Sequence, residues 1–204
     1  NGTNYSCQTL IGEVGVYQRA FGQVFPYGVA VDAEGRIFVT DYWENRVQVF
    51  DASGAFLTSV GNWGSNTSQF MSAYGIALDT KGDVYVADPI NHRIQKFSIG
   101  VPEWTQVNIN GFGVPTTTFM SSLVKFNDQL YAGAGDWDKG GRIWRSSDGI
   151  NWIAVNQPGF GEVSNSVIIS MIVFDGQLYA STGWGGGAGQ IWRSSDGENW
   201  VSIM

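Results

Sequence analysis

Few side chains in the chain could carry out covalent chemistry. It has one histidine, His92, and one cysteine, Cys7, so neither a three-histidine zinc site nor an internal disulfide can form. Asp136 and Asp138 could offer hard oxygen ligands to Ca²⁺, but two carboxylates alone are too few for a calcium site. No nucleophile–base pair is recognisable. We therefore expect no catalytic residues and no metal or cofactor, with Ca²⁺ as the one possibility left open.

Tryptophans in polar segments are better candidates for a binding site. We expect a ligand-binding surface formed by Trp43, Glu44, Trp63, His92, Asp136, Trp137, Asp138 and Trp184. Exposed tryptophans beside carboxylates commonly stack on sugar rings or grip a peptide, so the ligand would be a protein or a glycan. The alternative is that each tryptophan packs as a wedge between sheets, which is the commoner environment of this residue.

The elements that must position these residues are internal repeats. The segment "IWRSSDGINW" ends at Trp152 and "IWRSSDGENW" ends at Trp200, so nine of ten residues recur at a spacing of 48. In the first half, "YGVAVDAEGRIFVTD" (27–41) recurs as "YGIALDTKGDVYVAD" (74–88), 47 residues later. A period near 48 with four short strands per unit indicates an all-β fold, a β-propeller with four visible four-stranded blades.

Each unit is predicted to contain strands a, b, c and d in chain order. Strand a covers 28–32, 75–79, 122–126 and 170–174; strand b covers 37–40, 84–87, 130–133 and 178–181; strand c covers 46–50, 93–97, 142–145 and 190–193; strand d covers 56–60, 104–108, 152–156 and 200–203. This order places the b–c loops and d–a linkers on one face, and the a–b and c–d turns on the other. The Asp-Gly pairs suit tight c–d turns.

An extra N-terminal strand is predicted at 8–15, where a d strand of an earlier unit would stand. It could close the ring on the last blade, pair with another molecule and cause self-association, or belong to a longer array. An open strand edge is an aggregation hazard, so we expect it to be paired. We expect one propeller domain over 1–204, with 1–15 as the closing segment and blades of two kinds in 16–98 and 99–204.

The first half resembles NHL repeats. Its second unit has the Asp-x-x-Asn-x-Arg signature of that family in Asp88, Asn91 and Arg93. The first unit has Glu44 between Asp41 and Arg46, so the asparagine is replaced. The resemblance implies a propeller and a ligand at the face of the b–c loops and d–a linkers.

The second half resembles Asp-box (BNR-type) blades. "SSDGINW" (146–152) and "SSDGENW" (194–200) follow that motif with one residue fewer between Asp and Gly. Sialidases of this type need three convergent arginines, whereas Arg142, Arg145 and Arg193 lie on predicted strands c. The lyases among NHL propellers need more histidines than His92 alone supplies. The residues present thus argue against these two enzyme classes, while both resemblances indicate the fold rather than an activity.

Charge and targeting signals narrow the partners. The net charge is −7 and the pI is about 4.5, which argues against binding to nucleic acid. No apolar run is long enough to insert into a membrane. Glycosylation sequons begin at Asn1, Asn4 and Asn66 and favour an extracellular or cell-surface location.

We therefore predict a non-catalytic recognition or scaffold module. Three alternatives remain at this point. The chain could be a metal-dependent hydrolase or lyase, an assembly subunit that exchanges the strand at 8–15, or an engineered or chimeric propeller without a selected ligand.

Overall fold

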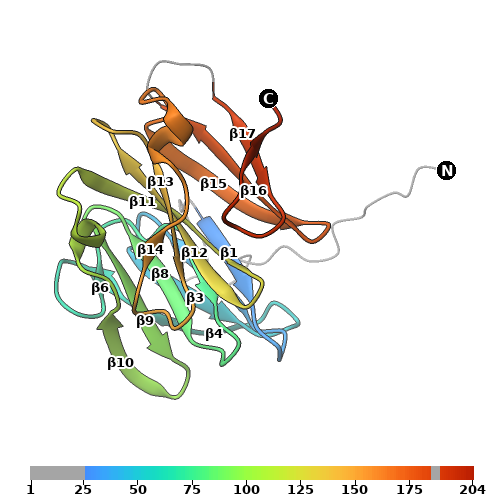
Figure 1. Cartoon of the computed structure of the whole chain (residues 1–204). Helices are drawn as coiled ribbons and strands as arrows, with labels where there is room; N and C mark the ends of the chain where they lie inside the picture. Colours follow the sequence, from blue (N-terminus) through green and yellow to red (C-terminus); the bar gives the residue numbers. More distant parts are fainter. Residues whose placement is uncertain (1–25, 185–188) are drawn as a thin grey trace.

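Four antiparallel, four-stranded blades stand side by side about a common axis in the computed structural model (Figure 1). The structure describes residues 26–184 and 189–204. Blade 1 is formed by β1 (Pro26–Val31), β2 (Ile37–Asp41), β3 (Arg46–Phe50) and β4 (Phe56–Val60). Blade 2 is formed by β7 (Ile76–Leu78), β8 (Val84–Asp88), β9 (Arg93–Ser98) and β10 (Val101–Gln106). Blade 3 is formed by β11 (Thr117–Phe126), β12 (Gln129–Asp136), β13 (Arg142–Ser146) and β14 (Ile153–Ala154). Blade 4 is formed by β15 (Val167–Phe174), β16 (Gln177–Gly183), β17 (Ile191–Ser194) and β18 (Val201–Ser202).

The predicted strands are found in order, with differences at their ends. β3 and β4 have the predicted bounds. β11 begins five residues before the predicted strand, because two register shifts let it follow β12 further. Short elements in the d–a linkers were not predicted. They are the parallel pair β5 (Asn62–Trp63) and β6 (Gln69–Phe70), and the 3-10 turns η1 (Asn110–Gly113) and η2 (Pro158–Gly161).

Hydrophobic clusters lie between neighbouring blades, because each strand sends alternate side chains to opposite sheet faces. In β8, Val84 and Val86 belong to the cluster shared with blade 1. Tyr85 and Ala87 belong to the cluster shared with blade 3. This second cluster joins the two halves of the sequence across one continuous core.

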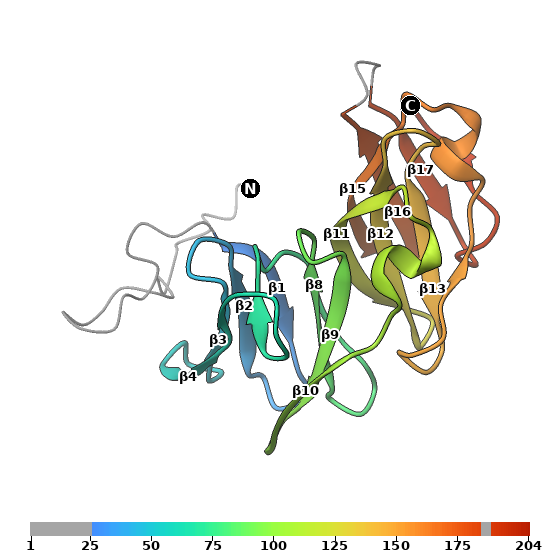
Figure 2. The ribbon, with the colours of Figure 1, turned by 90° about the vertical axis from the view of Figure 1, so that its left-hand side faces the viewer.

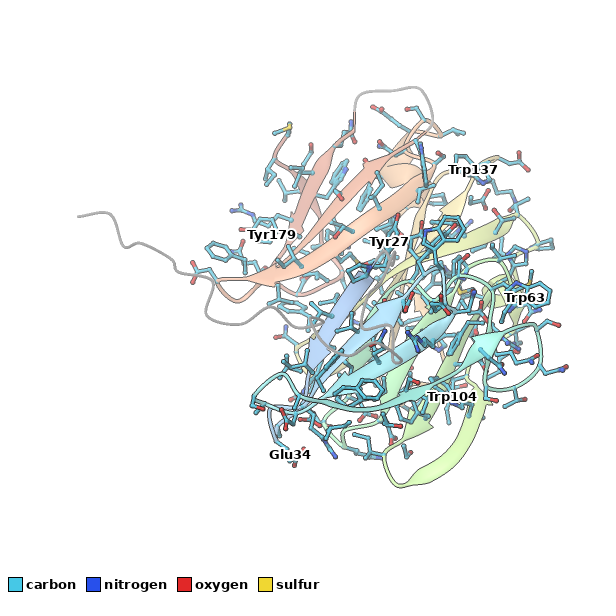
Figure 3. The ribbon with its side chains drawn as sticks, turned by 180° about the vertical axis from the view of Figure 1, so that it is seen from behind. Tyr27, Glu34, Trp63, Trp104, Trp137 and Tyr179 are labelled. Atoms are coloured by element: carbon cyan, nitrogen blue, oxygen red, sulfur yellow. The ribbon has the colours of Figure 1, made fainter. Side chains whose placement is uncertain are left out.

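Tryptophans of the d strands pack inside this structure. Trp104 is buried, with its ring 4.5 Å from that of Phe97 and 5.0 Å from that of Phe70 (Figure 3). The indole Nε1 of Trp152 donates a 3.1 Å hydrogen bond to the carbonyl of Val107 in the preceding blade. Trp104 and Trp152 therefore contribute to packing between neighbouring elements, and neither belongs to the predicted ligand-binding set.

The SSDG segments form the predicted c–d turns. The Asp148 carboxylate accepts the backbone N–H groups of Ile150 and Asn151, and the Ser146 hydroxyl accepts that of Gly149. These bonds, led by the one from the Asn151 backbone, hold the pKa of Asp148 well below its usual range. Asp196 has the same partners one repeat later, and hydrogen bonds from the Asn199 side chain and backbone lower its pKa.

Blades 3 and 4 are also connected through their main chains. β12 pairs with β15 at Gly135 and Val167, so the two blades form one continuous sheet. The N–H of Asp136 donates a 2.8 Å bond to the carbonyl of Ser166, beside that pair.

The two end blades have uncovered faces among the described residues (Figure 2). On β1, the side chains of Val29 and Val31 are 65% and 59% exposed. On β15, Ile172 and Phe174 are 62% and 69% exposed. The described residues therefore form an open arc of blades, and the predicted strand at 8–15 lies outside them.

Candidate functional site

Seven aromatic side chains of the described residues form a series of ring contacts across one face of the four blades. Neighbouring centroids are separated by 5.5 Å (Trp43–Tyr42), 5.7 Å (Tyr42–Tyr27), 3.9 Å (Tyr27–Tyr74), 5.2 Å (Tyr74–Phe119), 5.9 Å (Phe119–Trp184) and 6.2 Å (Trp184–Trp137). We call this set the aromatic arc. It takes residues from every blade, and Figure 3 labels Tyr27 and Trp137 on it.

The strand order explains why these rings meet. Tyr27 and Phe119 lie near the start of an a strand, and Tyr74 immediately precedes one. Trp137 and Trp184 follow the ends of b strands. Both positions open on the same face, because successive strands in a blade run in opposite directions. The a strands of neighbouring blades contact one another, so the rings near their starts lie close to the common axis.

A hydrogen bond joins two tyrosines at the centre of the aromatic arc. Tyr74 is buried and its hydroxyl donates a 2.9 Å hydrogen bond to the hydroxyl of Tyr27. Burial, followed by that hydrogen bond, raises the pKa of Tyr74 well above its usual value. Tyr74 therefore stays protonated at neutral pH, and its hydrogen bond links it to Tyr27 at the centre of the aromatic arc.

The ends of the arc are open to solvent. Trp43, Trp137 and Trp184 are 60%, 48% and 64% exposed. Exposed indole rings held against other rings offer apolar area at a small cost in side-chain entropy, which is what a binding hot spot needs. A cavity of about 320 Å³ lies on the axis below, lined by the four innermost strands, including Gly28, Gly75, Ser122 and Ser170.

A buried carboxylate stiffens each of the first three b–c loops. Asp41, Asp88 and Asp136 end their b strands and are 0% exposed. Asp136 accepts the N–H groups of Asp138 and Lys139 and the hydroxyl of Thr116 at 2.7 Å. The placement of Asp136 on the ligand surface was therefore wrong. Its carboxylate holds the loop that carries Trp137.

The structure divides the other predicted site residues into two groups. Trp43, Trp137 and Trp184 join the arc, while Glu44 and Asp138 are exposed next to two of them.

Two predicted residues lie outside the arc. Trp63, 68% exposed on β5, projects from the linker between blades 1 and 2, away from Tyr27 and Trp137 (Figure 3). His92 is half-buried at the boundary of blades 2 and 3, where its Nδ1 lies 2.6 Å from the carbonyl of Thr118.

Sequence reasoning missed Tyr27, Tyr74 and Phe119. The Tyr-Gly pair that recurs at 27 and 74 was a usable signal, because equivalent positions in a wheel lie at equal distances from the axis. Phe119 had no such signal, since the register shifts in β11 place it at the rim.

The described residues contain no group of three or more His, Cys, Asp or Glu side chains that could hold a metal ion. In the same residues, no helix has the length and apolar character needed to cross a membrane.

Sequence comparisons match parts of the chain. Residues 29–107 match the family model DUF5128, described as a 6-bladed beta-propeller. Protein brain tumor of Drosophila melanogaster is 39% identical over 67 residues, which are 33% of this chain and 6% of that protein. Both matches support the NHL-like character of the repeats.

Solved structures extend the likeness to most of the chain. The crystal structure of a nidogen/laminin complex contains a chain with a TM-score of 0.64 at 18% identity, covering 87% of this chain and 64% of that one. Virginiamycin B lyase of Staphylococcus aureus has a TM-score of 0.55 at 13% identity, covering 87% and 69%. The chain thus spans less than two thirds of the nidogen/laminin chain that it matches. The predicted all-β propeller fold is confirmed.

Proposed function

We propose that this propeller is a recognition module that binds a protein partner through the aromatic arc. The observation that carries the proposal is the continuous series of seven rings joined by six contacts, which includes three exposed tryptophans near its ends. The tryptophans near its two ends contribute little to the core, because about half or more of each of them faces solvent. The series offers instead a row of rigid anchors for apolar or aromatic side chains.

A protein ligand fits the surroundings of the arc. Glu44 and Asp138 flank it on loops of blades 1 and 3, and the net charge is −7. Opposite charge on a partner speeds encounter and orients it, so we expect basic residues around an apolar centre in the ligand. One structural neighbour comes from a nidogen/laminin complex, which supports a protein partner by analogy of fold.

A location outside the cell accords with this role. The sequon at Asn66 lies in the exposed linker between β5 and β6, where a glycan could attach without disturbing the core. We propose an extracellular or cell-surface location on this ground. Expression through a eukaryotic secretory pathway, followed by enzymatic removal of N-glycans, should shift the mass of the protein. Replacement of Asn66 by Gln should reduce that shift.

The test is a screen of displayed peptides and a glycan array with the purified protein, followed by affinity measurements on variants. Trp137→Ala and Trp184→Ala should each weaken a peptide ligand by about 30-fold or more, as expected for a hot-spot residue. Trp63→Ala is the matched control, because Trp63 is at least as exposed as either tryptophan but lies outside the aromatic arc. The affinity of the Trp63→Ala variant for the same peptide should stay within about twofold of that of the unchanged protein.

Two outcomes would refute the proposal. One is a ligand whose affinity depends on Trp63 and ignores the arc. The other is binding that depends on the arc but is confined to glycans, which would keep the site and change the class of ligand.

A further inference from the structure

The exposed face of blade 4 carries the same aromatic residues as a face that is buried on blade 3, with Ile172 in place of Val124. Phe126 of blade 3 is 4% exposed, whereas Phe174, its equivalent 48 residues later, is 69% exposed. Tyr131 is 1% exposed, and its equivalent Tyr179 is only partly buried. The side chains are the same, so the difference arises from what covers them.

The cover on blade 3 is the c–d turn of blade 4. The hydroxyl end of Tyr131 rests on Gly197, so closely that a Cβ at this glycine would overlap it. Arg145, next to Tyr131 in the sheet register, forms an ion pair with Glu198, which follows the glycine.

The same contact occurs one interface earlier. Tyr85 of blade 2 rests on Gly149 in the c–d turn of blade 3, again without room for a Cβ. The contact between a tyrosine on strand b and the glycine in the c–d turn of the next blade therefore occurs at two successive blade interfaces. Tyr179 is the third tyrosine of this series, and no described glycine covers it.

We infer that the open face of blade 4 is an interface for a further blade of the same type as blade 4. In this arrangement the c–d turn of the incoming blade places its glycine on Tyr179 and an acidic residue beside Arg193, the equivalent of Arg145. The incoming sheet buries Ile172 and Phe174, as blade 4 buries Val124 and Phe126.

The wheel has room for this blade. The family model that matches the chain describes six blades, and the described residues form four. The matched propeller chain in the nidogen/laminin complex is covered over 64% of its length. A six-bladed ring would leave places for two blades beyond the four that the described residues form.

A second copy of this chain fits the face less well. Blade 1 carries the other uncovered end face among the described residues, so it would have to supply the turn. Its c–d turn runs from Asp51 to Gly54 and continues with Ala55, which cannot pair with Arg193. A blade with the Gly-Glu sequence of the fourth unit satisfies both contacts. This inference does not depend on the proposed ligand site, which lies on another face.

The experiment appends a second copy of residues 157–204 after Met204 and measures thiol labelling at Phe174→Cys in a Cys7→Ser background. Labelling should be at least about tenfold slower in the extended protein than in the original chain, because the thiol then reacts only after local opening. Ile109→Cys is the control, since Ile109 is 77% exposed and remote from this face. Its labelling rate should not change.

A second extended protein tests the specific contact. Gly197→Val within the appended copy should restore fast labelling at Phe174→Cys, because the new side chain overlaps Tyr179. Equal labelling in the original and extended proteins overturns the inference. So does protection that survives the valine.

Measurements on the original chain test the inference if the extended protein does not fold. Tyr131→Ala should lower the Tm clearly, whereas Tyr179→Ala should leave it almost unchanged. Equal losses would mean that the face is already covered and would overturn the inference. A dimer in light scattering, with Phe174→Cys protected, would also overturn it and assign the face to a second copy.

Discussion

Alanine at Gly149 tests the contact on which the packing of blade 2 against blade 3 depends. Gly149 has a φ of 74°, and an L-residue in this left-handed region costs about 1–2 kcal/mol. The new Cβ also overlaps Tyr85, which is 0% exposed and cannot move into solvent. Overpacking of this kind costs about 1–3 kcal/mol more. Gly149→Ala should therefore lower the free energy of unfolding by about 2–5 kcal/mol.

Gly82 provides a matched control for the backbone term. Its φ is 82°, and an added Cβ meets nothing within 4 Å. Gly82→Ala should therefore cost only about 1–2 kcal/mol. Urea denaturation followed by tryptophan fluorescence measures both variants, with the slope checked for two-state behaviour.

A third variant separates the overlap from other effects. In a Tyr85→Phe background the cost of Gly149→Ala should decrease, since the hydroxyl that the Cβ overlaps is gone. If Gly149→Ala costs no more than Gly82→Ala, the tyrosine does not rest on the turn. The inference about Tyr179 would then lose its main support.

Three further predictions concern the carboxylates of the c–d turns, two arginine ion pairs, and calcium binding. Turn hydrogen bonds depress the pKa of Asp148 and Asp196, so the stability that these carboxylates contribute is complete above about pH 4 and is lost as the pH falls towards their pKa values in the folded protein. The Tm should therefore fall in this acidic range, and it should fall less steeply in a variant with both Asp148→Asn and Asp196→Asn. Arg93→Lys removes hydrogen bonds to three backbone carbonyls of the linker and should cost about 2–4 kcal/mol, whereas Arg36→Lys, at a partly exposed pair, should cost under about 1 kcal/mol in the same urea titration. Ca²⁺ should not change the Tm, and a rise that Asp138→Ala abolishes would instead support the metal-dependent alternative.

The sequence predicted the blades well because each level of information agreed. Period, alternation and turn residues all indicated the same strands, and β3 and β4 have the predicted bounds. The β5–β6 pair could not be predicted, because β5 is only two residues long and its pairing depends on a linker that Arg93 holds from another strand.

The members of the aromatic arc were predicted only in part, for a physical reason. Loop position indicates which residues reach the face, and it identified Trp43, Trp137 and Trp184. It does not show which side chains turn inwards. Asp136 occupies the position of Asp41 and Asp88, and all three are buried for the same purpose. Comparing repeat positions would have assigned Asp136 to the scaffold.

The main-chain pairing of β12 with β15 affects how the molecule comes apart. Among the described residues, blades 1, 2 and 3 meet through side-chain packing and hydrogen bonds that involve side chains, so they can separate without breaking a main-chain strand pair. Separating blades 3 and 4 also requires backbone bonds to break. Blades 3 and 4 should therefore unfold as one cooperative unit, with their slowest backbone amides exchanging hydrogen at the same rate. The amides of blades 1 and 2 should exchange at rates that differ from one blade to the other.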